Sequence, residues 1–164
     1  MAKIYAGIGS RRRTPSFISN MMTEVAAKLE SMDYVLRSGG AQGADKAFEA
    51  GVVYDDAKQI FRPKHATQFA IDLAANFHPY WDTCDSIARK LHGRNSMIIL
   101  GENLDSPVKF VICYTPDGKA SGGTGVGIRI AESFNIPVFN LFFPDVRDRI
   151  NDFIGVKKVE VDLL

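Results

Sequence analysis

Apolar residues recur along this chain in two alternating patterns, short continuous runs and three- to four-residue steps. The short runs predict strands, at residues 3–8, 34–37, 57–61, 108–114, 137–141 and 156–161. The stepped pattern predicts helices, at residues 14–32, 43–50, 66–77, 80–91, 126–134 and 145–153. Strands that alternate with helices in this way predict an open, doubly wound α/β sheet with right-handed crossovers.

Local signals refine several of these boundaries. Thr14 and Pro15 predict the start of the first long helix, with threonine as N-cap and proline at the first helical position. Gly51 is expected to end the second helix at its C′ position. Gly93 separates the helix at 80–91 from an ambiguous segment at 94–100, for which we favour a helical turn or short helix.

Composition places the chain among ordinary globular proteins. Its 164 residues are 46% hydrophobic and 24% charged, which predicts a single domain over residues 1–164. Because no apolar run approaches the roughly 20 residues that cross a bilayer, no membrane association is expected. The start of the chain lacks a signal-peptide layout, and Cys84 and Cys113 stand isolated, so we expect reduced thiols and a cytoplasmic location.

Charge and histidine spacing exclude further classes of ligand. The formal net charge is only +1, so no global field attracts nucleic acid or an anionic membrane, although a local basic patch remains compatible with it. His65, His78 and His92 fit no common metal-ligand spacing. We therefore expect neither a metal site nor a bound cofactor.

Three glycine-rich segments, each after a predicted strand, carry the main chemical signal: residues 7–10, 38–45 and 121–125. Glycine lets backbone N–H groups approach an anion closely, and a following helix N-terminus adds partial positive charge. In open parallel sheets, ligands bind outside the carboxyl ends of the strands. The three segments therefore predict a nucleotide or another phosphorylated ligand at one edge of the sheet.

The first segment contains Gly7 and leads into Ser10 and Arg11, followed by Arg12 and Arg13. An arginine fork binds phosphate in a bidentate manner, and a serine hydroxyl donates a further hydrogen bond. The alternative is that the three arginines are solvated surface. We favour a ligand contact for Arg11.

In the second segment, Ser38, Gly39, Gly40 and Gly43 are the expected backbone cradle, and Asp45 lies in the first turn of the helix that follows. Asp45 either caps that helix or accepts hydrogen bonds from a ribose hydroxyl or base, or orients a water. The segment is not a Walker A motif, and none of the three segments matches Gly-x-Gly-x-x-Gly cleanly. A standard dinucleotide site is therefore not expected.

Later residues add candidates from the same edge. The third segment either wraps a phosphate or ribose or only connects strand to helix, and Arg94 with Asn95 either contact the ligand or lie on plain surface. Tyr114 ends the predicted central strand and is expected to point toward the same crevice. These candidates are Arg94, Asn95, Tyr114, Gly122, Gly123, Thr124 and Gly125.

Two clusters of side chains have both a structural and a functional interpretation. His78, Tyr80 and Trp81 form an aromatic group that either stacks on a base or covers the core, and we favour the second. Asp82 and Asp85 lie one helical turn apart, and a solvated helix face is favoured over acid–base chemistry.

Four of these motifs, in order over about residues 3–141, resemble the SLOG superfamily, which contains DprA/Smf, LOG-type and YspA-like proteins. The motifs are Tyr5-Ala6-Gly7 with Ser10-Arg11, the segment 38–45, Arg94-Asn95, and the segment 121–125 with the strand that follows it. The resemblance implies a Rossmann-like, open, mostly parallel sheet with helices on both faces, and a site for nucleotides or nucleic-acid phosphates. Small relatives of this kind often pair through helices, which makes a homo-oligomer an expectation as well.

The resemblance leaves the activity open. LOG-type phosphoribohydrolases carry Pro-Gly-Gly-x-Gly-Thr-x-x-Glu with a catalytic glutamate, and aligned on Gly122 this chain has Arg129 at that position. Our first hypothesis is therefore a nucleotide-binding domain that grips phosphate. The second is an enzyme acting at a nucleotide's N-glycosidic bond, with Asp45 or Glu132 as nucleophile or general base. The third is a DprA-like binder of single-stranded DNA.

Overall fold

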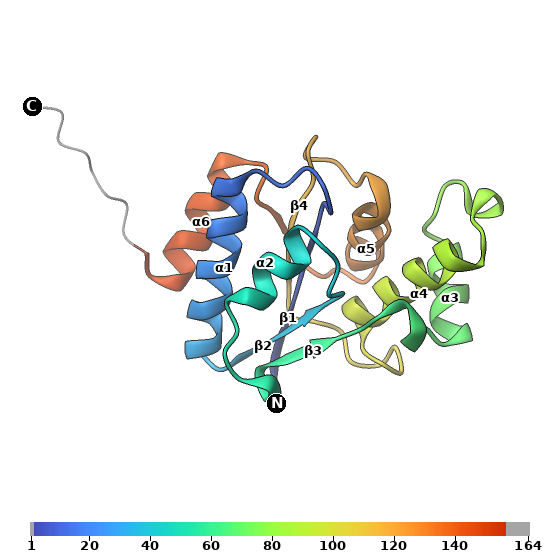
Figure 1. The fold of residues 1–164 in the computed structure, drawn as a ribbon, viewed down its shortest axis with the longest axis horizontal. Helices are drawn as coiled ribbons and strands as arrows, with labels where there is room; N and C mark the ends of the chain where they lie inside the picture. The colour runs from blue at the N-terminus through green and yellow to red at the C-terminus, as the bar shows by residue number, and fades with distance from the viewer. Residues whose placement is uncertain (1, 157–164) are drawn as a thin grey trace, which may run out of the picture.

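The computed structural model describes residues 2–156. Its sheet contains five parallel strands in the order β3-β2-β1-β4-β5 (Figure 1). The strands are β1 (Lys3–Gly9), β2 (Tyr34–Ser38), β3 (Lys58–Ile60), β4 (Val111–Tyr114) and β5 (Val138–Asn140). This arrangement confirms the α/β, Rossmann-like class and the single compact domain.

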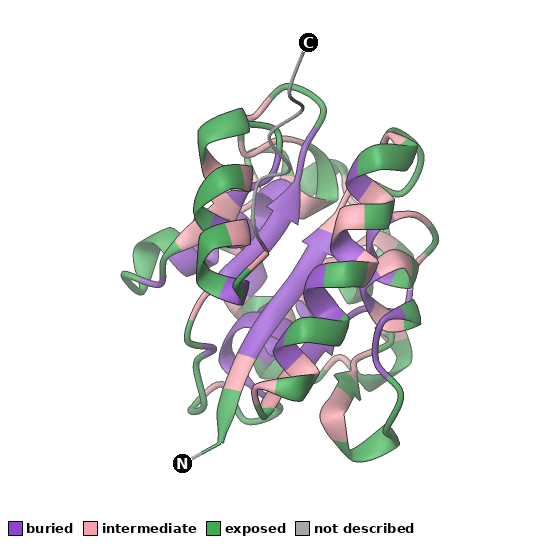
Figure 2. Ribbon diagram, turned by 90° about the vertical axis from the view of Figure 1, so that its left-hand side faces the viewer, coloured by how far each residue is buried: buried purple, intermediate pink, exposed green. Residues whose placement is uncertain are grey.

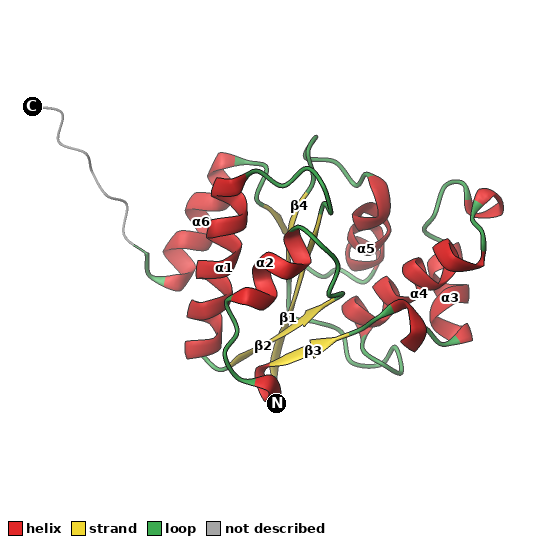
Figure 3. Cartoon of the chain, in the orientation of Figure 1, coloured by secondary structure: helices red, strands yellow, loops and turns green. Residues whose placement is uncertain are grey.

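Helices cover both faces of the sheet (Figure 3). One face carries α1 (Ser16–Ser31), α2 (Ala44–Ala50) and α6 (Pro144–Ile154). The other carries α3 (Gln68–Ala75), α4 (Ser86–Leu100) and α5 (Gly122–Ser133). Three 3₁₀ turns complete the structure, at Asp55–Ala57, Pro63–His65 and Trp81–Thr83. In the described part of the chain, none of the helices combines the length and apolarity of a membrane span.

The central strands are buried on both faces, as their continuous apolar runs require (Figure 2). Tyr5 and Ile112 pack beneath α1 and α2, whereas Ala6, Val111 and Cys113 pack beneath α4 and α5. The sheet therefore separates two apolar cores, which fix the helices on either side of the strand ends.

The strand order creates a switch point between β1 and β4. The chain moves outward from β1 to β2 and β3, and then returns to place β4 on the other side of β1. Gly9 at the end of β1 is in register with Tyr114 at the end of β4, and Ser10 N–H donates to the Tyr114 carbonyl at 3.1 Å. The segments that follow β1 and β4 consequently start side by side at the carboxyl edge.

The start of α1 differs from the sequence prediction. The helix begins at Ser16, and Pro15 rather than Thr14 occupies the N-cap position. The Thr14 hydroxyl donates to the Ser10 carbonyl at 2.9 Å, so it fastens the loop after β1 and does not cap the helix. Gly51 does end α2, but with a φ of −84° and not in the left-handed conformation expected of a C′ glycine.

The α4 region was predicted in two pieces and forms one helix. Residues 81–83 form a 3₁₀ turn, and α4 starts after Asp85, whose side chain accepts a hydrogen bond from Ala88 N–H at 2.8 Å. Gly93 lies inside this helix, and the position requires glycine because a Cβ there would come within 2.5 Å of Ile71 Cγ1 on α3. Close helix packing, and not a chain break, accounts for this glycine.

The third glycine-rich segment also differs from its prediction. Gly122, Gly123 and Gly125 form the first turn of α5 instead of a loop before it, so this helix starts four residues earlier than its apolar pattern indicates. The strand predicted at 156–161 lies outside the described residues apart from Val156, which is not in a strand.

Candidate functional site

A cleft of about 760 Å³ opens at the carboxyl edge of the sheet, over the switch point between β1 and β4. The end of β1 and the segment after it line the cleft with residues 8–13, and the segment after β4 lines it with residues 115–117. The start of α5 contributes residues 121–124, and the β2–α2 segment contributes Ala41 and Asp45. The cleft thus lies where open parallel sheets bind their ligands.

Cations dominate the walls of this cleft. Arg11, Arg12 and Arg13 are exposed along one wall, and Arg94 enters from α4. Ser10 Oγ accepts a hydrogen bond from Arg13 N–H at 3.0 Å, which folds the arginine segment into a turn. The cleft gathers positive charge although the whole chain is nearly neutral.

The N-terminus of α5 opens into the same cleft. Among the described residues, no side chain caps this helix, so its first N–H groups lack intrahelical partners. A Cβ placed at Gly122 or Gly123 would meet no described atom within 4 Å. Asn95 Nδ2 donates to the Gly123 carbonyl at 3.2 Å and so positions this turn against α4. An anion can therefore approach bare backbone N–H groups here.

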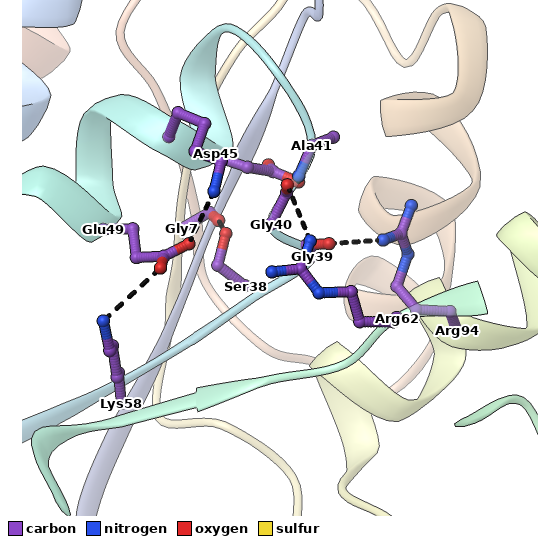
Figure 4. A network of polar contacts seen from close by, with 11 residues as sticks. Gly7, Ser38, Gly39, Gly40, Ala41, Asp45, Glu49, Lys58, Arg62 and Arg94 are labelled. Carbon is purple, nitrogen blue, oxygen red and sulfur yellow. Dashed lines mark hydrogen bonds and ion pairs between the residues drawn. The ribbon is translucent and has the colours of Figure 1, made fainter. Parts of the chain in front are cut away.

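The glycines of the β2–α2 segment serve packing and do not line the cleft. Arg94 Nη1 donates to the Gly39 carbonyl at 2.7 Å and to the Phe61 carbonyl at 3.2 Å. Arg62 Nη1 donates to the Gly40 carbonyl at 3.1 Å (Figure 4). Two arginine side chains therefore hold the backbone carbonyls of this segment in place.

Gly43 has a different structural task. Its φ of 80° favours glycine, and a Cβ would come within 2.5 Å of the carbonyl oxygens of Ser10 and Arg11. The next residue, Ala44, donates its N–H to the Ser10 carbonyl at 3.1 Å. Gly43 thus lets the two segments at the strand ends touch, and this contact supports the arginine wall.

Asp45 is the buried carboxylate of the cleft and is only 6% exposed. Its Oδ2 accepts a hydrogen bond from Ala41 N–H at 3.2 Å. Burial raises the pKa of Asp45 to about 6, although the nearby Arg94 guanidinium and the backbone hydrogen bonds act in the opposite direction. The absence of a side chain at Gly39 leaves room for both charged groups, since a Cβ there would lie 2.5 Å from Arg94 Nη1 and 2.8 Å from Asp45 Oδ2.

Several predicted site residues lie away from the cleft lining. Ser38 is buried and donates its hydroxyl to the Gly7 carbonyl at 2.6 Å, while Gly7 packs against Phe48 and Leu36. Tyr114 belongs to the core beneath α1 and α2. These three residues support the strand ends on which the site is built.

The α5 candidates divide in the same way. Thr124 lines the cleft, whereas Gly125 packs against the Ala120 carbonyl. Glu132 is exposed in the last turns of the helix, outside the lining. Arg129, which the resemblance aligns with the glutamate of LOG-type enzymes, donates to the carbonyls of Phe77 and Ala120 at 3.1 and 2.6 Å. Its contacts fasten α5 to neighbouring loops.

Sequence reasoning missed three contributors. His92 lines the cleft one turn before Asn95, and burial lowers its pKa to about 4, with His78 and Arg94 acting in the same direction. Asp117 is exposed in the cleft and accepts hydrogen bonds from Lys119 N–H and Ser121 Oγ. A polar turn directly after the central strand was the available signal for Asp117, whereas nothing in the sequence marked His92 or the supporting Arg62.

No family model, no curated protein and no solved structure matches this chain. The resemblance to the SLOG superfamily therefore stays an expectation from four short motifs. The function is accordingly argued from the geometry of the cleft.

Proposed function

We propose that this protein binds a nucleotide or nucleotide-like molecule and holds it by its phosphate. The observation that carries the proposal is the shared cleft, which exposed arginines and the uncapped N-terminus of α5 both line. Guanidinium groups and free backbone N–H groups at helix N-termini both recur as phosphate ligands in proteins. The volume of about 760 Å³ lies within the range of sites for small organic ligands.

The arrangement suggests how the ligand lies. The phosphate binds at Gly122 and Gly123, because backbone can approach it most closely there. Arg11 faces the phosphate from the opposite wall, and the Thr124 hydroxyl adds a donor. The nucleoside then extends toward Asp45, whose carboxyl group meets a ribose hydroxyl or a base edge.

Calorimetric titration with a panel of nucleotides tests this proposal. Replacing Arg11 with alanine should weaken binding of the best nucleotide by about 1.5–3 kcal/mol, the range for a lost hydrogen bond to a charged group. Lys109→Ala is the matched control, since it removes one exposed positive charge just before β4, at the amino edge of the sheet. Equal affinity in the Arg11 variant and the wild type, or an equal loss in both variants, would refute the arginine contact.

A second candidate is cleavage at the nucleotide's N-glycosidic bond, and Asp45 is the observation that favours it. A carboxyl group with a pKa of about 6 at the edge of the cleft can exchange a proton near neutral pH. Glu132 is exposed outside the cleft lining, so the catalytic role falls to Asp45. Release of free base, followed by chromatography, should occur with the wild type and stop in Asp45→Asn while nucleotide binding persists.

Single-stranded nucleic acid is the less favoured ligand. Trp81, which would be the stacking platform under this hypothesis, lies outside the cleft lining and packs against His78 and His92 with ring centroids 6.1 Å apart in each case. Arg89 covers Trp81, with its guanidinium carbon 5.2 Å from the ring centroid. An oligonucleotide that binds more tightly than mononucleotides, with steep salt dependence, would reverse this order.

A further inference from the structure

We propose that His78, Cys84 and His92 form a binding site for a zinc-type divalent metal ion beside the cleft. Their donor atoms, two imidazole nitrogens and one thiol sulfur, all lie within 4.8 Å of one another. His78 and Cys84 belong to the segment between α3 and α4, and His92 belongs to α4 itself. The sequence spacing of the histidines predicted no metal site, because the fold and not the spacing brings these residues together.

The distances suit a tetrahedral ion. With zinc–nitrogen and zinc–sulfur bonds of about 2.1 and 2.3 Å, neighbouring ligand atoms are separated by about 3.4–3.6 Å. Cys84 Sγ and His78 Nε2 are already 3.6 Å apart, and the two imidazole centroids are separated by 4.6 Å. Only the His92 ring must move closer to the other two ligands, and His92 is itself only partly buried.

The chemistry of the donors selects the metal. Imidazole and thiolate bind zinc and related ions, whereas magnesium and calcium require oxygen ligands, and the cluster supplies none from its side chains. His92 Nδ1 is buried and, within residues 2–156, makes no hydrogen bond, so this ring has an unsatisfied nitrogen. Trp81 packs against both imidazole rings and shields this side of the cluster from water.

One contact must change when the metal binds. Tyr80 N–H donates to His78 Nδ1 at 3.0 Å, which places the ring proton on Nε2, the nitrogen that faces Cys84. Coordination through Nε2 moves the ring proton to Nδ1 and opens the contact with Tyr80, and Cys84 loses its thiol proton to solvent. His78 therefore changes tautomer on binding, which provides a specific signature.

Cobalt(II) titration of the full chain tests the site, because thiolate ligation of a tetrahedral cobalt ion gives a sulfur-to-metal charge-transfer band. We expect one ion per chain and that band in the wild type. Cys84→Ser should abolish the band, and His92→Ala should weaken zinc binding in a chelator competition by about 100-fold or more, since even residues that only support a ligand are worth about 10–100-fold.

His65→Ala is the matched control, since it removes the only histidine outside the cluster. It should bind zinc like the wild type, and circular dichroism should show that every variant is folded. A wild type that binds less than one ion per chain, a cobalt spectrum unchanged in Cys84→Ser, or equal losses in the His65 and His92 variants would overturn the proposal.

Nitrogen NMR of the imidazole rings tests the wild type without any substitution. His78 should pass from the Nε2-protonated to the Nδ1-protonated form when zinc is added, whereas His65 should keep its tautomer. An unchanged His78 ring at saturating zinc would overturn the three-ligand assignment.

Discussion

The two glycine-rich walls beside the cleft, the β2–α2 segment first and the start of α5 second, look alike in the sequence, but their glycines have opposite roles. At Gly39 the space for a side chain is already filled by Arg94 and Asp45, whereas at Gly123 that space is open to the cleft. The first glycine permits the protein to contact itself, and the second leaves backbone accessible to a ligand. A cluster of glycines at a strand end therefore does not by itself show which surface touches the ligand.

Arginine explains the difference between the two walls. Arg94 is 6% exposed and is committed to backbone carbonyls, while Arg11 is exposed and available. The buried arginine holds the Gly39 carbonyl of the β2–α2 segment, and the exposed arginine lines the same cleft as the start of α5. The comparison predicts that substitutions at the first wall change stability and that those at the second change binding.

Removal of Arg94 should break this contrast most strongly. In Arg94→Ala the carbonyls of Gly39 and Phe61 lose their donor, and the buried Asp45 loses its nearest positive charge. We expect the free energy of unfolding to fall by about 3–5 kcal/mol, the usual cost of leaving a buried charge unpaired. Urea denaturation measures this loss, and Asp45→Asn in the same background should recover part of it. A loss below about 1 kcal/mol would contradict the supporting role.

The pH dependence of stability should isolate Asp45. The folded state raises its pKa from 3.8 to about 6, so the native protein holds this proton more tightly than the unfolded chain does. Stability should therefore fall as the pH rises from below the unfolded pKa to above the folded pKa, by about 3 kcal/mol in total for a pKa difference of this size. The difference in unfolding free energy between wild type and Asp45→Asn, followed across pH 3.5–7, should show this slope. A constant difference would contradict it.

Matched glycine-to-alanine substitutions should sharpen the comparison. Gly39→Ala pushes a methyl group toward Arg94 and Asp45, and overpacking of this kind costs about 1–3 kcal/mol of unfolding free energy. Thermal denaturation and urea curves measure the cost. Wild-type stability in this variant would show that the segment yields more easily than its contacts indicate.

Gly123→Ala is the counterpart with the smallest expected effect on stability. Its Cβ meets open space, and alanine favours helix, so unfolding free energy should rise by up to about 1 kcal/mol or stay unchanged. Nucleotide affinity should nevertheless fall by about 1 kcal/mol, because the methyl group keeps the phosphate from the backbone. Calorimetry on the folded variant measures this change. Unchanged affinity would place the phosphate elsewhere in the cleft.

The sequence was sufficient for the architecture and for the edge of the sheet that bears the cleft. Short apolar runs such as residues 108–114 are typical of the middle of a parallel sheet, and the strand ends then share one edge. Helix limits were less accessible, since Gly93 is a chain break in the sequence pattern and a helix contact in the structure. Local pattern cannot show which distant side chain fills the space beside a glycine.

The site itself was only partly visible for the same reason. Arg11, Thr124 and Asn95 lie in the cleft, and the sequence marked them as candidates. The burial of Arg94 depends on contacts with Gly39 and Phe61, which lie 55 and 33 positions earlier in the chain, and no local signal encodes such contacts. The juxtaposition of His78, Cys84 and His92 likewise arises from how the segment between α3 and α4 folds back onto α4.

A single turn of α4 connects the β2–α2 segment with the start of α5. Arg94 donates a hydrogen bond to the Gly39 carbonyl of the β2–α2 segment, and its neighbour Asn95 donates one to the Gly123 carbonyl at the start of α5. A rotation of that turn would therefore move the β2–α2 segment and the start of α5 together, since each is hydrogen-bonded to one of these two adjacent residues.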